Sequence, residues 1–171
     1  VCYSAFRTRT HLPQRLAVAA ADAVTMRRHL AAVGRGERPG EVHFGQASDD
    51  APRPKIAFLY TGNGSNYLGM GRELFATSPV FRATLERCDE VMRPHLARPL
   101  LEAIFGGASE TTLLDQMSYA QPALFALQAA LTEQWRSWGI TPAVALGHSA
   151  GEYAAAWAAG VFSLEDGLKL V

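Results

Sequence analysis

The hydrophobic positions of the chain follow two patterns, short continuous runs and stripes with a spacing of three or four residues. The continuous runs are typical of buried strands, and they occupy residues 15–20, 56–60 and 143–146. The striped segments predict helices over residues 23–33, 78–92, 122–138, 150–160 and 163–171. Because strands alternate with helices, the pattern predicts an α/β fold with a mainly parallel sheet.

Capping residues predict where several of these helices begin, and the apolar stripes predict which of their side chains are buried. Asp22, Ser78 and Ser163 are suited to helix N-caps, Pro79 fits a first turn, and Asp166 completes a capping-box pattern with Ser163. We expect the stripes to form core, through Val24, Met26, Leu30 and Val33 in the first helix, Phe81, Leu85, Cys88 and Met92 in the second, and Leu124, Leu127, Leu131, Trp135 and Trp138 in the third.

The segment from Gly34 to Pro54 follows neither pattern. It contains repeated glycine and proline positions together with Ser48-Asp49-Asp50, which is the composition of a linker or an irregular crossing segment. We therefore predict a domain boundary here. Residues 1–54 would form a small α/β domain, and residues 55–171 would belong to a second domain.

Composition narrows the class of protein. The 171 residues are 49% hydrophobic, and 16 basic residues balance 16 acidic ones, so no net field favours nucleic acid or an anionic membrane. Cys2 and Cys88 have no metal-type spacing and indicate free thiols in a reducing cytoplasm. No apolar stretch approaches the roughly 20 residues needed to span a bilayer. The chain begins at Val1 and ends at Val171 within an apolar periodic stretch, so we expect a piece of a longer protein.

The segment Gly147-His148-Ser149-Ala150-Gly151 has the GxSxG pattern between a predicted strand and a predicted helix, where this pattern is meaningful. A serine on such a tight turn has a strained backbone, and its hydroxyl projects above the sheet edge. Glycines two residues before and after it remove side chains that would collide across the turn. The N-terminus of the following helix favours developing negative charge, and the N–H of Ala150 is a natural oxyanion donor. Ser149 is therefore the candidate nucleophile.

A second turn, Gly62-Asn63-Gly64, also follows a predicted strand. The carboxyl ends of parallel strands meet at one edge of a sheet, where α/β folds place their sites, so this turn is expected to open beside Ser149. Its backbone N–H groups are candidates for the second oxyanion donor. The turn lacks the further residues of a GxGxxG or GK[ST] phosphate loop.

Three segments together resemble the acyltransferase domains of modular type I polyketide synthases, related to malonyl-CoA:acyl-carrier-protein transacylases. They are FLYTGNGSNYLGMG at 58–71, SYAQPA at 118–123 and GHSAGE at 147–152, so the resemblance covers roughly residues 55–171. The upstream segment HLPQRLAV at 11–18 is similar to the linker that joins ketosynthase to acyltransferase in such synthases. The resemblance implies an incomplete α/β-hydrolase-like acyltransferase large subdomain, preceded by a small α/β linker domain over residues 1–54.

The resemblance also implies a reaction and roles for site residues. Ser149 would accept an acyl group, which we expect to be malonyl, from acyl-CoA and pass it to the phosphopantetheine thiol of an acyl-carrier protein. The backbone N–H groups of Asn63 and Ala150 would form the oxyanion hole, although the family usually has Gln where this chain has Asn63. His148, Gly62 and Gly64 would shape the substrate pocket. The family's base histidine and carboxylate-binding arginine would lie beyond Val171. No bound cofactor and no metal are expected.

Some residues, and the chain as a whole, also have a second interpretation. His148 is a poor general base because it is bonded directly to the nucleophile's residue, and it competes with a purely structural role. Glu152 suits the first turn of a helix, and Cys88 suits a core. Alternative functions are a serine esterase that uses the same turn with water as acceptor, and a non-catalytic scaffold or docking fragment of a synthase. The favoured interpretation is a cytoplasmic, multifunctional synthase in which an adjacent ketosynthase and an acyl-carrier protein are the partners.

Overall fold

The computed structural model describes residues 4, 7–47, 54–106 and 111–171. The chain divides into two compact units, Val1–Arg53 and Pro54–Val171, and each has its own two-stranded sheet. Cys2 and the Ser48-Asp49-Asp50 segment lie outside the described residues. Among the described residues, no helix is both long and apolar enough to cross a membrane.

The first unit contains β1 (Gln14–Val18), α2 (Ala23–Gly34) and β2 (Val42–Gln46). The predicted strand and helix are confirmed, and the Asp22 side chain caps α2 by accepting the Thr25 N–H at 2.7 Å. The prediction of an irregular segment after Gly34 is wrong for β2, which pairs antiparallel with β1 and places Phe44 opposite Leu16. The glycine and proline positions around β2 mask its alternation of apolar and polar residues.

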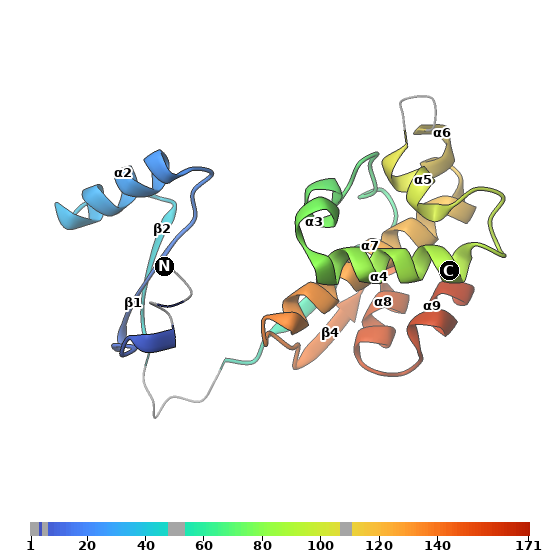
Figure 1. Ribbon diagram of the computed structural model, residues 1–171. Helices are drawn as coiled ribbons and strands as arrows, with labels where there is room; N and C mark the ends of the chain where they lie inside the picture. The colour runs from blue at the N-terminus through green and yellow to red at the C-terminus, as the bar shows by residue number, and fades with distance from the viewer. Residues whose placement is uncertain (1–3, 5–6, 48–53, 107–110) are drawn as a thin grey trace. The chain divides into compact units, whose positions relative to one another are not determined.

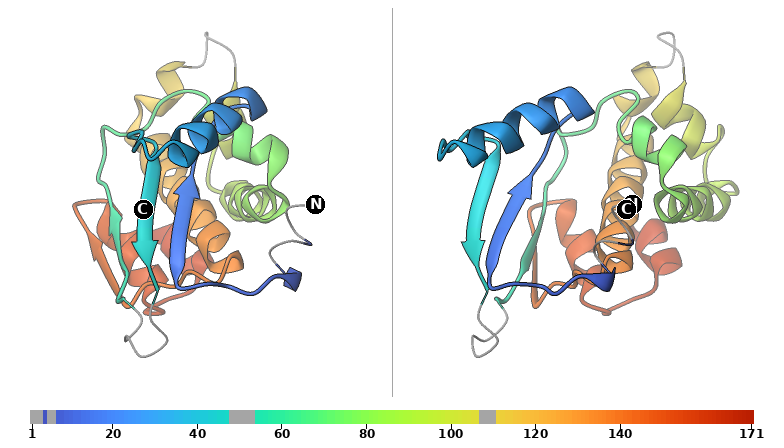
Figure 2. Two further views of the ribbon diagram at one scale, coloured as in Figure 1. Left: turned by 90° about the vertical axis from the view of Figure 1, so that its left-hand side faces the viewer. Right: turned by 60° about the vertical axis from the view of Figure 1, so that its left-hand side comes forward.

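Burial in the first unit differs from the prediction. Four residues of β1 are exposed, and Val24 and Leu30 of α2 are exposed, whereas His29 and Ala32 are buried. Figure 2 shows the reason, because α2 lies across the end of the strand pair where β1 ends and β2 begins. A helix in that position leaves most of both strand faces uncovered, and it buries a different side from the one that its apolar stripe indicates.

The second unit combines a parallel pair of strands with helices that lie between the strands or follow them in the chain. Its elements are β3 (Ala57–Tyr60), α3 (Arg72–Thr77), α4 (Pro79–Met92), α5 (Leu100–Phe105), α6 (Thr111–Leu114), α7 (Met117–Ser137), β4 (Val144–Gly147), α8 (Gly151–Ala158) and α9 (Leu164–Leu170). As predicted, β3 and β4 are parallel, and their last paired residues are Tyr60 and Gly147. The caps at Ser78 and Ser163 are also confirmed, since each serine hydroxyl accepts a backbone N–H of the first helical turn.

The core of this unit forms where α4 lies across α7 (Figure 1). The predicted stripe of α4 is confirmed, because Phe81, Leu85, Cys88 and Met92 are all buried. The middle of α7 is buried around much of its circumference, and its fully buried alanines are Ala123, Ala126, Ala129 and Ala130. Small side chains at these positions let neighbouring helices approach closely.

The prediction for α7 needs two corrections. The helix begins at Met117, so Pro122 lies inside it and is buried. Trp135 and Trp138, which were expected in the core, are exposed and pack edge to face against each other with ring centroids 5.2 Å apart. The central turns of α7 pack on several sides, so a single apolar stripe does not describe its buried surface.

The strands of the second unit are covered on one side. Tyr60 is buried and Phe58 packs against the core, whereas Leu59, Val144 and Leu146 are exposed, Leu59 to 73%. Leu59 and Leu146 are register partners, so they lie on the same face of the sheet. The expectation that the 56–60 run is fully buried is wrong for this face, which no other described segment of the second unit covers.

Candidate active site

Ser149 occupies a sharp turn between β4 and α8. Its φ is +54°, and it is the single non-glycine residue with a positive φ in the described part of the chain. The His148 N–H donates to the Tyr60 carbonyl at 3.0 Å, which continues the β3–β4 pairing to the residue before the nucleophile. The Gly151 N–H then donates to the His148 carbonyl at 3.0 Å and starts the helix. A left-handed, exposed serine at this point matches the strained turn that the sequence predicts.

The two glycines that flank Ser149 are required by close backbone approach. A Cβ on Gly147 would lie 2.3 Å from the Gly151 carbonyl oxygen and 2.4 Å from the Glu152 nitrogen. A Cβ on Gly151 would lie 2.3 Å from the Tyr60 carbonyl oxygen. The first clash is across the turn itself, and the second is between the start of α8 and the end of β3. Both positions therefore exclude any side chain.

The Gly62 turn, defined here as residues 61–66, lies directly against Ser149. A Cβ on Gly62 would lie 2.8 Å from the His148 carbonyl oxygen and 3.0 Å from the Ser149 Cβ. The turn is held by its own hydrogen bonds, between the Thr61 and Ser65 hydroxyls at 2.9 Å and from the Gly64 N–H to Asn66 Oδ1 at 3.2 Å. The structure thus brings together the two turns that the sequence places at one sheet edge.

Two backbone N–H groups beside the nucleophile are left without an acceptor. Neither the N–H of Asn63 nor that of Ala150 makes a hydrogen bond with the described residues. The side chain of Asn63 is engaged elsewhere, since its Nδ2 contacts the Met117 sulfur at 3.5 Å. Ala150 is the N-cap of α8, so the positive end of that helix also faces this region. Donors of this kind can stabilise negative charge that develops on an oxygen bound near Ser149.

A hollow of about 560 Å³ opens beside the nucleophile, and it is lined by Gln121, Ser149, Ala150, Glu152, Tyr153, Ala156 and Phe162. Asn63 and Gly64 line a separate hollow of about 230 Å³ with Met117. Gln121 is not among the predicted site residues, although it lies inside the SYAQPA segment. The signal was a polar side chain among the apolar residues that open α7.

None of the remaining candidates among the described residues is hydrogen-bonded to the serine hydroxyl. No histidine ring of the described residues is hydrogen-bonded to Ser149, and His148 places its Nδ1 toward Gly62. Glu152 is exposed in the first turn of α8. Cys88 lies in the core, where burial raises the pKa of its thiol to about 12, so it is not a nucleophile at neutral pH. Among the described residues, no three His, Cys, Asp or Glu side chains are grouped to hold a metal ion.

The family model of the acyl transferase domain matches residues 57–171. The PKS-NRPS hybrid synthetase ATPKS of Aspergillus niger and the spectinabilin polyketide synthase system protein NorA of Streptomyces orinoci are each 38% identical over the whole of this chain. The chain spans 9% of the length of each of these relatives.

Solved structures show the same similarity. The acyl transferase domain of ZmaA matches 95% of this chain with 31% identity and a TM-score of 0.83, and the chain covers 37% of it. The acyltransferase domain from the second module of the salinomycin polyketide synthase matches 92% with 38% identity and a TM-score of 0.77, and 35% of it is covered. A malonyl CoA-acyl carrier protein transacylase from Clostridium perfringens matches 68% with 29% identity and a TM-score of 0.61, and 35% of it is covered.

Proposed function

The chain belongs to the acyl transferase domain family, and we propose that it supplies the nucleophile and oxyanion hole with which a polyketide synthase loads an extender unit. The donor is an acyl-CoA, and the acceptor is the phosphopantetheine thiol of an acyl-carrier protein. The observation that carries this proposal is the contact between the strained Ser149 turn and the Gly62 turn, each of which holds one backbone N–H without an acceptor among the described residues.

In the first half-reaction, the Ser149 Oγ attacks the thioester carbonyl carbon. A general base takes the hydroxyl proton, the carbon–sulfur bond breaks, and coenzyme A leaves as its thiol after receiving that proton. The carbonyl oxygen carries negative charge in the tetrahedral intermediate. In this proposal, the N–H groups of Asn63 and Ala150 donate hydrogen bonds to this oxygen. The positive electrostatic potential at the N-terminus of α8 stabilises its negative charge further.

In the second half-reaction, the carrier-protein thiol attacks the Ser149 ester. The thiol proton passes through the base to the departing serine oxygen, so the enzyme returns to its starting state and the acyl group is a thioester again. Because no described histidine ring is hydrogen-bonded to Ser149, we assign the general base to a residue outside the described part of this chain.

We propose malonyl as the acyl group and residues 1–54 as the linker to an adjacent ketosynthase. Ala150 is a small residue directly after the nucleophile, in the wall of the 560 Å³ hollow, where a longer side chain would take space from the acyl group. Structural relatives include the Clostridium perfringens transacylase and an acyl carrier protein S-malonyltransferase from Vibrio cholerae, which supports a malonyl donor.

The test uses the full-length protein that carries this sequence. After incubation with malonyl-CoA, intact-protein and peptide mass spectrometry should find one malonyl group on Ser149, and addition of carrier protein should remove it. Ser149→Ala should abolish loading, whereas Cys88→Ala, in the core, should leave it near normal. Undiminished loading of Ser149→Ala would overturn the nucleophile assignment. Release of the acyl group to water, independent of carrier protein, would favour an esterase, and no loading at all would favour a scaffold.

A further inference from the structure

A buried glutamine on α7 holds the residue from which the Gly62 turn begins. Gln128 is 7% exposed, and its Nε2 donates a hydrogen bond to the Thr61 carbonyl oxygen at 2.8 Å. Thr61 follows the last residue of β3 and precedes Gly62. The same carbonyl oxygen would lie 2.7 Å from a Cβ on Gly151, so it sits between α7 and the start of α8.

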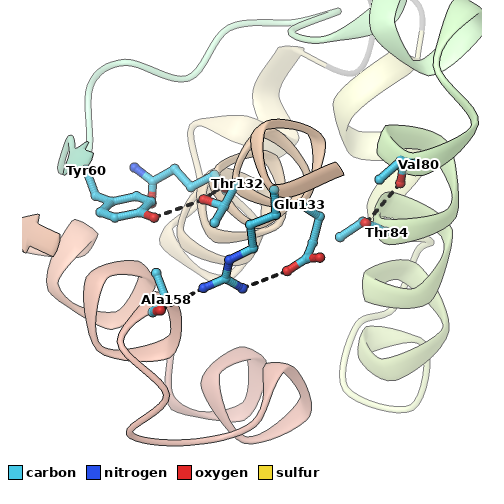
Figure 3. Close-up of polar contacts among 8 residues, drawn as sticks. Tyr60, Val80, Thr84, Thr132, Glu133 and Ala158 are labelled. Carbon is cyan, nitrogen blue, oxygen red and sulfur yellow. Dashed lines mark hydrogen bonds and ion pairs between the residues drawn. The ribbon is translucent and has the colours of Figure 1, made fainter. Parts of the chain in front are cut away.

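A second contact from α7 holds the neighbouring residue, Tyr60. The Tyr60 and Thr132 hydroxyls are hydrogen-bonded at 2.9 Å (dashed line in Figure 3), and the Thr132 hydroxyl donates to the Gln128 carbonyl oxygen at 2.7 Å. A hydroxyl has one proton, so the Tyr60 hydroxyl is the donor to Thr132. Gln128 and Thr132 lie one helical turn apart, and together they attach α7 to the end of β3.

The polar nature of Gln128 is not explained by packing. Its Oε1 is buried and has no hydrogen-bond partner among the described residues. Leaving a buried acceptor unpaired opposes folding, and an apolar side chain of similar volume would avoid that penalty. Most buried neighbours on α7 are indeed apolar. We therefore attribute the presence of an amide side chain at position 128 to the hydrogen bond that it donates to the Thr61 carbonyl.

We propose that Gln128 is a positioning residue for acyl transfer, an inference that rests on the proposed function. Its bond to the Thr61 carbonyl fixes the orientation of the peptide between Thr61 and Gly62. The next peptide, between Gly62 and Asn63, carries the Asn63 N–H, so the orientation of the first peptide influences the direction of this N–H relative to Ser149. Gln128 contacts neither nucleophile nor substrate, and it acts through the Asn63 donor.

The first test is Gln128→Met in the full-length protein, since methionine keeps the length of the side chain and removes both polar atoms. The rate of Ser149 malonylation at saturating malonyl-CoA should fall roughly 10- to 100-fold, because a displacement of about 1 Å in a catalytic group can cost that much. The thermal unfolding midpoint should change little, because the variant removes the unpaired Oε1 but also leaves the Thr61 carbonyl without its donor, and these two effects have opposite signs. A malonylation rate within about twofold of the unsubstituted protein would overturn the proposal, as would a midpoint that falls together with the rate.

Gln134→Met is the matched control, because Gln134 is a buried glutamine on the same helix that contacts Ser78, away from the Gly62 turn. This variant should lower the midpoint and keep the malonylation rate. If it slows malonylation as much as Gln128→Met does, the effect is general to α7 and the proposal fails.

Gln128→Glu provides a second measurement that does not depend on the first variant folding. A protonated carboxyl can donate to the Thr61 carbonyl, whereas a carboxylate cannot, so its malonylation rate relative to the unsubstituted protein should rise as the pH is lowered. The adjacent Tyr60 stays protonated, since burial raises its pKa. A ratio that does not change with pH would overturn the proposal. If the unsubstituted protein itself is not malonylated on Ser149, the proposed function has failed instead.

Discussion

Two adjacent positions of the Gly62 turn should respond very differently to substitution. Gly62→Ala adds a Cβ only 2.8 Å from the His148 carbonyl oxygen, so the two turns must separate. Asn63→Gln keeps the backbone N–H and loses only the contact of its side chain with Met117. We expect single-turnover malonylation to fall by up to about 10²–10³-fold for Gly62→Ala, the range for loss of one oxyanion donor, and to be largely retained for Asn63→Gln. Loss of activity in Asn63→Gln as complete as in Ser149→Ala would contradict a main-chain role.

The chemistry of Cys88 follows from its burial in α4. Its pKa rises from an ordinary value of 9.0 to about 12, so the folded protein holds the proton where the unfolded chain loses it. The contribution to stability is therefore present below about pH 9 and is lost as the pH rises towards 12. In a Cys2→Ser background, iodoacetamide should leave Cys88 unmodified from pH 7 to pH 9 and should label it on unfolding in urea. Labelling of the folded protein at pH 9 as fast as that of the urea-unfolded protein would contradict this.

Helix caps and the Ser149 turn were predictable because their determinants are adjacent in sequence. Ser78 and Pro79 place the start of α4, and the spacing of Gly147, Ser149 and Gly151 places a tight turn between strand and helix. Backbone conformation at such points depends on a few consecutive residues. The meeting of the two turns was also predictable, since parallel strands bring their carboxyl ends to one edge.

Burial was less predictable because it depends on segments that are distant in sequence. Trp135 has the spacing of a core residue, yet no described segment covers it, and Leu59 lies in an apolar run whose one face is open. Pro122 suggested a helix start, whereas α7 extends upstream of it. Gln128 gave no signal of its role, and Gln121 showed only a polar side chain among apolar neighbours, because a polar residue on a helix shows its direction only after the helix is packed.

The cap of α9 supplies a prediction about a single element. Ser163 accepts the Asp166 N–H at 3.0 Å and donates to the Asp166 carboxylate at 2.7 Å. Ser163→Ala should lower the free energy of unfolding by about 1 kcal/mol, as is typical for loss of an N-cap. Chemical denaturation followed by circular dichroism measures this change, and Ser163→Thr should recover most of it. An unchanged midpoint for Ser163→Ala would show that the Arg87–Glu165 ion pair suffices to hold the start of the helix.

The uncovered face of the β3–β4 sheet bears on how residues 1–171 behave by themselves. Leu59, Val144 and Leu146 expose contiguous apolar surface of a kind that promotes association. A serine hydroxyl also needs a base within about 3 Å, and no described histidine ring is bonded to Ser149. We therefore expect the isolated polypeptide to bind a hydrophobic dye, to self-associate in light scattering, and to transfer no malonyl group to carrier protein. Transfer within tenfold of the full-length protein would contradict this.

The parallel pairing of β3 with β4 also has a consequence for the order of folding. Tyr60 and Gly147 lie on paired strands that are far apart in the sequence, with α4 and α7 between them. Closing so long a loop costs entropy that is recovered only after the intervening helices have packed. The left-handed serine and its two donors therefore assemble late. In hydrogen exchange, the amide of His148, which is bonded to Tyr60, should open only with the whole unit, so the nucleophile is either fully formed or absent.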